Sequence, residues 1–276
     1  MKKKADLSNM ILILLLLLGL SLLLYPTVSD WWNSRVQTRA VAGYTDTLAQ
    51  MQEEDYSEEI AAAKAYNKSL IGRYNAYLLP DEQKQQYEKL LNIGGDGIMA
   101  IIEIPTIDLL LPIYHGTEEN VLQVAVGHLE WTSLPIGGEN THCVVSSHRG
   151  LPSARLFTDI DQLTVGDHVY IRVLNEQHCY EVDKITIVEP DDTKDLLIEE
   201  GKDLLTLVTC TPYGINSHRL LVRGHRISAE EEAKIVRVTA DAMIIDKLIV
   251  APFVLLPLVI ILLLWFFKNK KGGSNR

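Results

Sequence analysis

The stretch that decides the fold reads Thr206-Leu-Val-Thr-Cys-Thr-Pro-Tyr-Gly-Ile-Asn-Ser-His-Arg219. It continues an aliphatic run that begins at Leu204, and such a run predicts a buried strand that ends at Cys210. The turn residues at 211–214 interrupt the pattern, and a second aliphatic run starts at Arg219. Two strands joined by so short a turn pair with each other, so we expect Cys210 and Arg219 to be neighbours.

A thiol beside a guanidinium group favours nucleophilic chemistry. The cation stabilises the thiolate, which is the nucleophile, and an arginine within reach can also stabilise an oxyanion. Most unpaired cysteines are instead small hydrophobic core residues, and this alternative stays open for Cys210. The many polar side chains between Thr206 and Arg219 argue against it, because the end of a core strand seldom carries so many hydrogen-bond donors.

A candidate base lies upstream, in Thr141-His-Cys-Val-Val-Ser-Ser-His-Arg-Gly150. The alternation of a strand places Val144, Ser146 and His148 on one face, and His148 stands where the strand runs out into a glycine turn. A histidine and a cysteine at neighbouring strand ends would form a base–nucleophile pair. The chain has seven other histidines, and a surface or turn-capping role is open to His148, so spacing alone does not select it.

Both ends of the 276-residue chain are apolar. The run from Ile11 to Leu24 follows lysines at 2–4, and the run from Ile244 to Phe267 precedes lysines at 268–271. The second run is long enough to span a bilayer, and we interpret the first as an uncleaved anchor rather than a signal peptide. Because positive flanks remain inside, both termini are expected in the cytoplasm, with the domain between them outside the cell membrane.

Charge and cysteine content limit the partners and cofactors. The formal net charge of −10 argues against nucleic acid as a partner. Three cysteines do not make a disulfide framework, so we expect Cys143 and Cys179 to be reduced core residues within strands. No metal-binding spacing occurs, and we expect no metal and no cofactor.

The chain is expected to divide at a glycine-rich stretch, residues 94–97. Residues 1–26 form the cytoplasmic tip and first anchor, and residues 27–93 form a helical arm in which Ser57 caps a helix and residues 79–92 form another. Residues 94–228 contain about eight short strands, with short helices at 120–126 and 152–163, and this density favours a mainly β, closed eight-stranded barrel. A connecting helix (229–243), a transmembrane helix (244–267) and a basic tail (268–276) follow.

Residues 206–210 match the TLxTC signature of sortases, the membrane-anchored cysteine transpeptidases of Gram-positive bacteria. The likeness extends over roughly residues 90–228 and resembles the class C, pilus-assembling sortases. The resembling stretches include Gly95-Asp-Gly97, Ile102-Glu-Ile-Pro105, Leu111-Pro-Ile-Tyr-His-Gly116, Ser147-His-Arg-Gly-Leu-Pro-Ser153 and His218-Arg-Leu-Leu-Val-Arg-Gly224.

The resemblance implies a sortase barrel with His148, Cys210 and Arg219 as its catalytic trio. It implies that Cys210 attacks the Thr–Gly bond of an LPxTG-like sorting signal, and that the resulting thioester passes to a pilin lysine. His148 would transfer protons, and Arg219 would hold the substrate and its oxyanion. We also expect Ser147, Thr209 and Thr211 to bind substrate. The alternatives are a sortase that anchors proteins to peptidoglycan, and a membrane-tethered barrel that only binds.

The sequence departs from the class C pattern at the lid, which commonly carries an Asp-Pro-aromatic motif. No such motif occurs here, and Tyr74-Asn-Ala-Tyr-Leu-Leu-Pro-Asp81 runs directly into the next helix. We therefore expect a shortened or absent lid, with a groove that is open or is covered only by Tyr74 or Tyr77.

Overall fold

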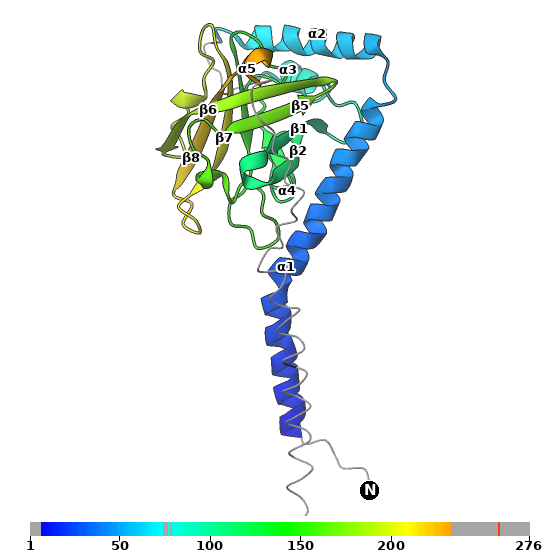
Figure 1. Cartoon of the computed structure of the whole chain (residues 1–276), viewed down its shortest axis with the longest axis vertical. Helices are drawn as coiled ribbons and strands as arrows, with labels where there is room; N and C mark the ends of the chain where they lie inside the picture. The colour runs from blue at the N-terminus through cyan, green and yellow to red at the C-terminus, as the bar shows by residue number, and fades with distance from the viewer. Residues whose placement is uncertain (1–6, 74–76, 78, 233–258, 260–276) are drawn as a thin grey trace, which may run out of the picture. The chain divides into compact units, whose positions relative to one another are not determined.

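The structure is a computed structural model that describes residues 7–73, 77, 79–232 and 259 (Figure 1). Residues 30–235 form one compact unit, and residues 1–29 with 236–276 form another. The helices are α1 (Leu7–Leu48), α2 (Glu53–Leu70), α3 (Asp81–Tyr87), α4 (Glu119–Leu122) and α5 (Ala229–Glu232). The strands are β1 (Ile98–Ile104), β2 (Leu109–His115), β3 (Val126–His128), β4 (Thr141–Ser146), β5 (His168–Val173), β6 (Glu176–Val188), β7 (Asp203–Thr211) and β8 (His218–Arg226).

The eight strands close into a barrel in the order β1-β2-β3-β4-β7-β8-β6-β5, which confirms the predicted mainly β barrel. The pairs β2–β3 and β4–β7 are parallel, and the other pairs are antiparallel. Alternate residues of each strand point inward, so that Val145 of β4 and Leu205 and Leu207 of β7 join one large apolar core. The parallel β4–β7 pair joins segments that are far apart in the sequence.

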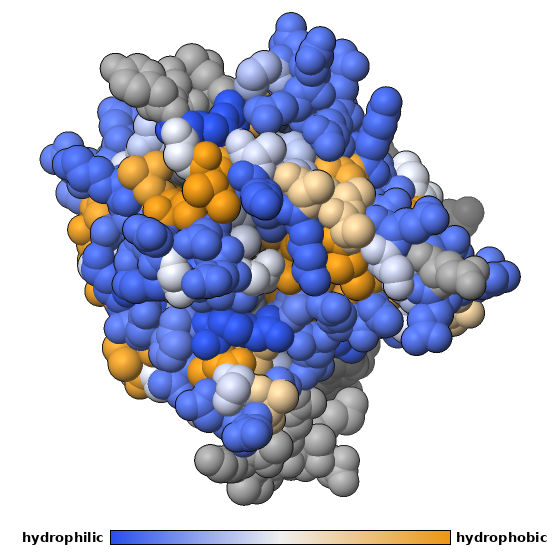
Figure 2. Space-filling view, turned by 90° about the horizontal axis from the view of Figure 1, so that it is seen from above, coloured by the Kyte–Doolittle hydropathy of each residue, from blue (hydrophilic) through white to orange (hydrophobic). Residues whose placement is uncertain are grey.

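The helices before β1 pack against this barrel. Tyr44 of α1 is buried against Ile98 and Ile101, and its hydroxyl donates to Met99 O (3.2 Å) and accepts from Leu174 N (3.0 Å). In Figure 1, α2 lies across one end of the barrel, with α3 next to it. Seen from that end, the surface is largely hydrophilic with separate hydrophobic patches (Figure 2).

Several element boundaries differ from those predicted. Helix α2 starts at Glu53 after a capping box at Gln52, and Ser57 lies inside the helix, where its hydroxyl donates to Glu53 O. Strand β4 ends at Ser146, so that His148 lies in the loop beyond it. The segment expected as a helix at 152–163 contains only the short 3-10 helix Ile160–Gln162, because Phe157 and its neighbours turn into the barrel core instead.

Strand β3 (Val126–His128) is not predicted by the sequence, which favours a helix over residues 120–126; helix α4 ends at Leu122 instead, and Val126 begins the strand. Three residues are too few to display an alternating pattern. The strand nevertheless completes the barrel by bridging β2 and β4.

Helix α1 contains one stretch, Asn9–Leu48, that is long and apolar enough to cross a membrane. The helix continues through Pro26. Apart from residue 259, the predicted second span at 244–267 lies outside the described residues, as do most of the connecting helix at 229–243 and the basic tail at 268–276.

Candidate active site

Cys210 lies near the end of β7, on the outer face of the barrel. Its neighbours Leu205 and Leu207 belong to the interior core, whereas Val208 belongs to a separate apolar cluster outside it. Because side chains alternate along a strand, Cys210 faces the same way as Val208. Cys210 is half-buried, while Cys143 is buried. Burial raises the pKa of the Cys143 thiol, which keeps this group protonated and unreactive.

Arg219 is the direct cross-strand partner of Cys210 in the β7–β8 hairpin. Facing residues of an antiparallel pair have Cβ atoms about 4.5–5.5 Å apart, so the two side chains start from adjacent positions. The Arg219 guanidinium donates to Asn216 O (3.3 Å) and His218 O (3.2 Å), which ties it to the turn between the two strands. The predicted neighbourhood of the thiol and the guanidinium is thus confirmed at the level of the backbone.

His148 is brought to the same level by the parallel pairing of β4 with β7. The register aligns Ser146 with Val208, and Ser147 N donates to Val208 O (3.2 Å) one residue beyond the strand. Beyond this register, His148 follows Ser146 by two residues in the loop after β4, and Cys210 follows Val208 by two residues in β7. His148 and Arg219 are half-buried, as is Cys210. The three residues therefore lie at the same end of the neighbouring strands β4, β7 and β8, and we refer to them as the row.

Ser147, Thr209 and Thr211 are all buried in this arrangement. Thr209 Oγ1 donates to Ser147 O (2.8 Å), and Ser147 Oγ donates to Ala125 O (2.7 Å). Thr211 Oγ1 accepts from Arg149 (3.4 Å). The two threonine hydroxyls join the loop of His148 to the strand of Cys210, and contact of the three residues with a substrate stays a prediction.

An apolar strip extends along the outer face from the row, made by Val144, Val208 and Leu221. Trp131 packs against it, and the ring of Tyr77 meets Trp131 edge to face at 4.9 Å between centroids. The other tyrosine named in the lid prediction, Tyr74, lies outside the described residues.

A buried polar network stabilises the strand positions beyond the strip. His142 contacts Thr206 Oγ1 and Leu197 O, both at 2.8 Å. Burial lowers the pKa of His142, which favours a neutral ring that donates to the carbonyl and accepts from the hydroxyl. Next to it, Arg223 forms ion pairs with Asp183 (2.9 Å) and with a glutamate of the β6–β7 loop. His142 is thus committed to structure, which removes it as a competitor of His148.

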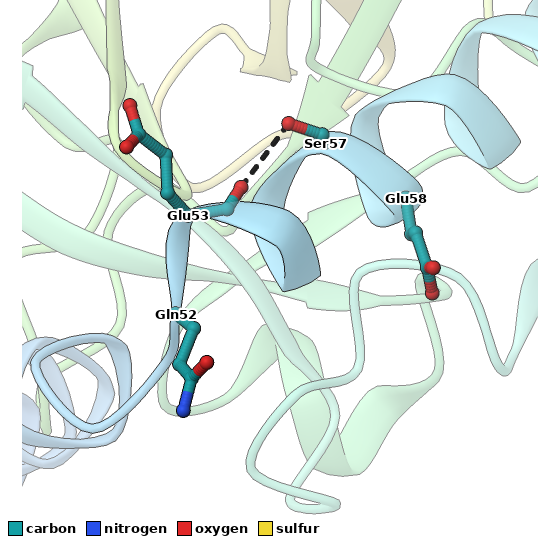
Figure 3. Close-up of a pocket in the computed structure, with 4 residues that line it drawn as sticks. All are labelled: Gln52, Glu53, Ser57 and Glu58. Carbon is teal, nitrogen blue, oxygen red and sulfur yellow. Dashed lines mark hydrogen bonds between the residues drawn. The ribbon is translucent and has the colours of Figure 1, made fainter.

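Two hollows of the surface lie away from the row of three. One, of about 570 Å³, is lined by Gln52, Glu53, Ser57 and Glu58 at the start of α2 (Figure 3). Another, of about 410 Å³, lies between α3 and the loop of Trp131. Among the described residues, no group of three His, Cys, Asp or Glu side chains converges as a metal site requires.

The sequence profile of the sortase domain matches residues 102–227, which include all three residues of the row. The crystal structure of sortase C1 from Streptococcus agalactiae is 51% identical, covering 69% of this chain and 98% of that one, with a TM-score of 0.66. The chain belongs to the sortase family. The solved sortase C1 structures that match it are 42% to 51% identical and support a class C sortase.

Two further relatives help to place this sortase. The structure of sortase C from Streptococcus pneumoniae, described for its catalysis and pilin substrate specificity, is 43% identical, covers 69% of this chain and 97% of that one, and has a TM-score of 0.63. Sortase D of Bacillus subtilis (strain 168) is 33% identical over 132 residues. That match covers 47% of this sortase and 64% of the Bacillus protein.

Sequence reasoning did not single out two residues that border the row in this sortase. Arg149 follows His148 and forms an ion pair with Asp161, and Tyr213 lies in the β7–β8 turn against Gly150. Both residues lie in the part of the sequence that resembles the sortases. Their places in the turns that follow His148 and Cys210 are the signal that could have identified them.

Proposed function

We propose that this sortase is a membrane-anchored cysteine transpeptidase that polymerises pilins outside the cell. It cleaves an LPxTG-like sorting signal between Thr and Gly and transfers the acyl group to a pilin lysine. The proposal is supported by the positions of His148, Cys210 and Arg219 at one end of the neighbouring strands β4, β7 and β8, to which the β4–β7 and β7–β8 registers bring these chain segments.

In the first step, the Cys210 thiolate attacks the Thr carbonyl carbon. A C–S bond forms, and the negative charge on the carbonyl oxygen is stabilised by Arg219, whose planar group offers several donors. The Thr–Gly C–N bond then breaks, and His148 protonates the departing glycine amine. The product is a thioester on Cys210.

In the second step, the lysine amine of another pilin attacks the thioester carbonyl. His148 accepts the amine proton, the C–S bond breaks, and Cys210 leaves as thiolate. One amide bond has been exchanged for another, so the reaction needs neither ATP nor a cofactor. A reaction that needs no ATP suits the space outside the cell. The anchors predicted at both ends of the chain would hold the domain there.

The substrate class is supported by similarity to the pneumococcal sortase C, which is associated with pilins. Incubation with a purified LPxTG-bearing pilin tests it, because pilin polymerisation produces a ladder on a denaturing gel. The same comparison in cells separates the alternative: attachment to peptidoglycan gives no ladder, so a single wall-linked product would contradict the pilus assignment and favour wall anchoring.

The catalytic proposal is tested by mass spectrometry of the full-length protein with a sorting-signal peptide. Wild-type protein should show an acyl adduct on Cys210, and Cys210→Ala should show neither adduct nor polymer while melting at an unchanged temperature. Cys143→Ser, which alters a buried thiol, is the control and should keep the adduct if it folds. Normal polymerisation by Cys210→Ala would contradict Cys210 as the nucleophile, and wild-type protein that binds the peptide with neither adduct nor polymer would favour a role in binding only.

A further inference from the structure

Tyr213 links the two loops that bring the row of three together. It lies in the turn between Cys210 and Arg219, and its ring sits directly on Gly150, two residues beyond His148. A Cβ atom built on Gly150 would lie 2.7 Å from Cε2, 3.0 Å from Cζ and 3.2 Å from Cδ2 of the ring. The ring therefore occupies space that any side chain at position 150 would need.

The His148 loop is fixed from its other sides by hydrogen bonds. Phe157 N donates to His148 O (3.1 Å), and Gly150 N donates to Thr158 Oγ1 (3.1 Å). Arg149 reaches Thr211 Oγ1 at 3.4 Å. On the side that faces the β7–β8 turn, Gly150 lies against the ring of Tyr213.

We infer that Tyr213 is a positioning residue, whose ring on Gly150 sets the separation between His148 and the Cys210–Arg219 pair. The inference rests on the proposed function of the three residues. Tyr213 acts through packing, because its ring, although 61% of the residue is exposed, lies against Gly150 of the other loop. Its hydroxyl is not needed for this contact, so Phe at position 213 should serve as well as Tyr.

Tyr213→Ala should lower kcat for thioester formation roughly 10- to 100-fold, since displacement of a catalytic group by about 1 Å has an effect of that size. KM should stay nearly constant, and Tyr213→Phe should restore kcat. Ile215→Ala is the matched control, because it removes another exposed apolar side chain from the same turn. A raised KM with unchanged kcat would make Tyr213 a substrate contact and overturn the inference.

Gly150→Ala provides a second test, because it should act by displacing the Tyr213 ring. Gly150 has φ +78°, so the variant also carries backbone strain; Gly201→Ala is the control for strain, with φ +75° and open space around its Cβ. Gly150→Ala should lower kcat in the wild-type background and have little further effect in Tyr213→Ala. Equal losses in both backgrounds would contradict the inference.

A substrate-free measurement separates this inference from the proposed reaction. The rate of Cys210 alkylation by a small reagent should change in Tyr213→Ala and return in Tyr213→Phe, whatever the natural substrate is. If no LPxTG peptide is turned over but this pattern holds, the reaction is wrong and the positioning role stands. An unchanged alkylation rate in Tyr213→Ala would overturn the positioning role itself.

Discussion

At the scale of single residues, the environment of each cysteine separates the proposed nucleophile from the cysteines of the core. Cys210 is half-buried on the outer face, whereas Cys143 lies inside the barrel, where burial raises its thiol pKa. Cys179 is also buried. The three cysteines therefore have two different environments in one barrel, and burial separates Cys143 and Cys179 from the half-buried Cys210.

A thiol-labelling experiment checks this difference. A small alkylating reagent should modify only Cys210 in the native protein, while all three cysteines should react in denaturant. Peptide mass mapping measures the sites, and Cys210→Ala should remain unlabelled when folded. Labelling of Cys143 at a rate similar to that of Cys210 would contradict the assignment of the barrel interior.

A substitution at Arg219 tests whether the planar shape of its guanidinium group or only its positive charge is needed for activity. Lys at position 219 keeps the positive charge but loses the planar group that donates to two oxygens at once. We expect Arg219→Lys to lose at least about 10²-fold in kcat, the size reported for removal of an oxyanion donor. Circular dichroism and melting should be unchanged, and activity near that of the wild type would show that charge alone suffices.

At the scale of secondary-structure elements, the long strands were predictable and the short segments were not. The segments that form β1, β7 and β8 contain enough alternating or aliphatic residues to be predicted as strands from the sequence. Strand β3 has three residues and depends on pairing with β2 and β4, which local sequence does not reveal. For the site, proximity of Cys210 to Arg219 followed from one hairpin, whereas the position of His148 depends on long-range pairing and came from family resemblance.

The segment before α3 gives a prediction about access to the site. The described part places Tyr77 against Trp131, beside the apolar strip. We expect this segment to leave Cys210 open, so a bulky thiol reagent should label Cys210 nearly as fast as a small one. Deletion of residues 70–80 should change that ratio little. Slow bulky labelling that the deletion accelerates would show that the segment covers the site.

At the scale of the whole molecule, buried histidines should make folding sensitive to acid. His128 is fully buried; its ring donates to Ser133 O (2.8 Å) and accepts from the Tyr87 hydroxyl (3.1 Å). Burial lowers the pKa of His128 from 6.5 to about 4, and that of His178 also falls to about 4. A folded pKa below the unfolded one means that the unfolded chain binds protons first as pH falls.

The free energy of unfolding should therefore be greatest above pH 6.5 and fall between pH 6.5 and pH 4. For His128 the shift corresponds to roughly 3 kcal/mol, at about 1.4 kcal/mol per pH unit. Urea unfolding at several pH values measures it, and His128→Gln should flatten the fall over this interval. An equally steep fall in His128→Gln would show that other groups dominate acid unfolding.

The parallel pairing of β4 with β7 has a consequence for when the protein becomes reactive. The thiol and the guanidinium belong to one hairpin and become neighbours as soon as that hairpin forms. The imidazole arrives only when a segment about 60 residues earlier in the chain is docked alongside β7, through the Ser146–Val208 register. In the proposed mechanism, an incompletely folded chain therefore carries Cys210 without its proton-transfer partner, and acyl transfer begins only once the barrel is complete.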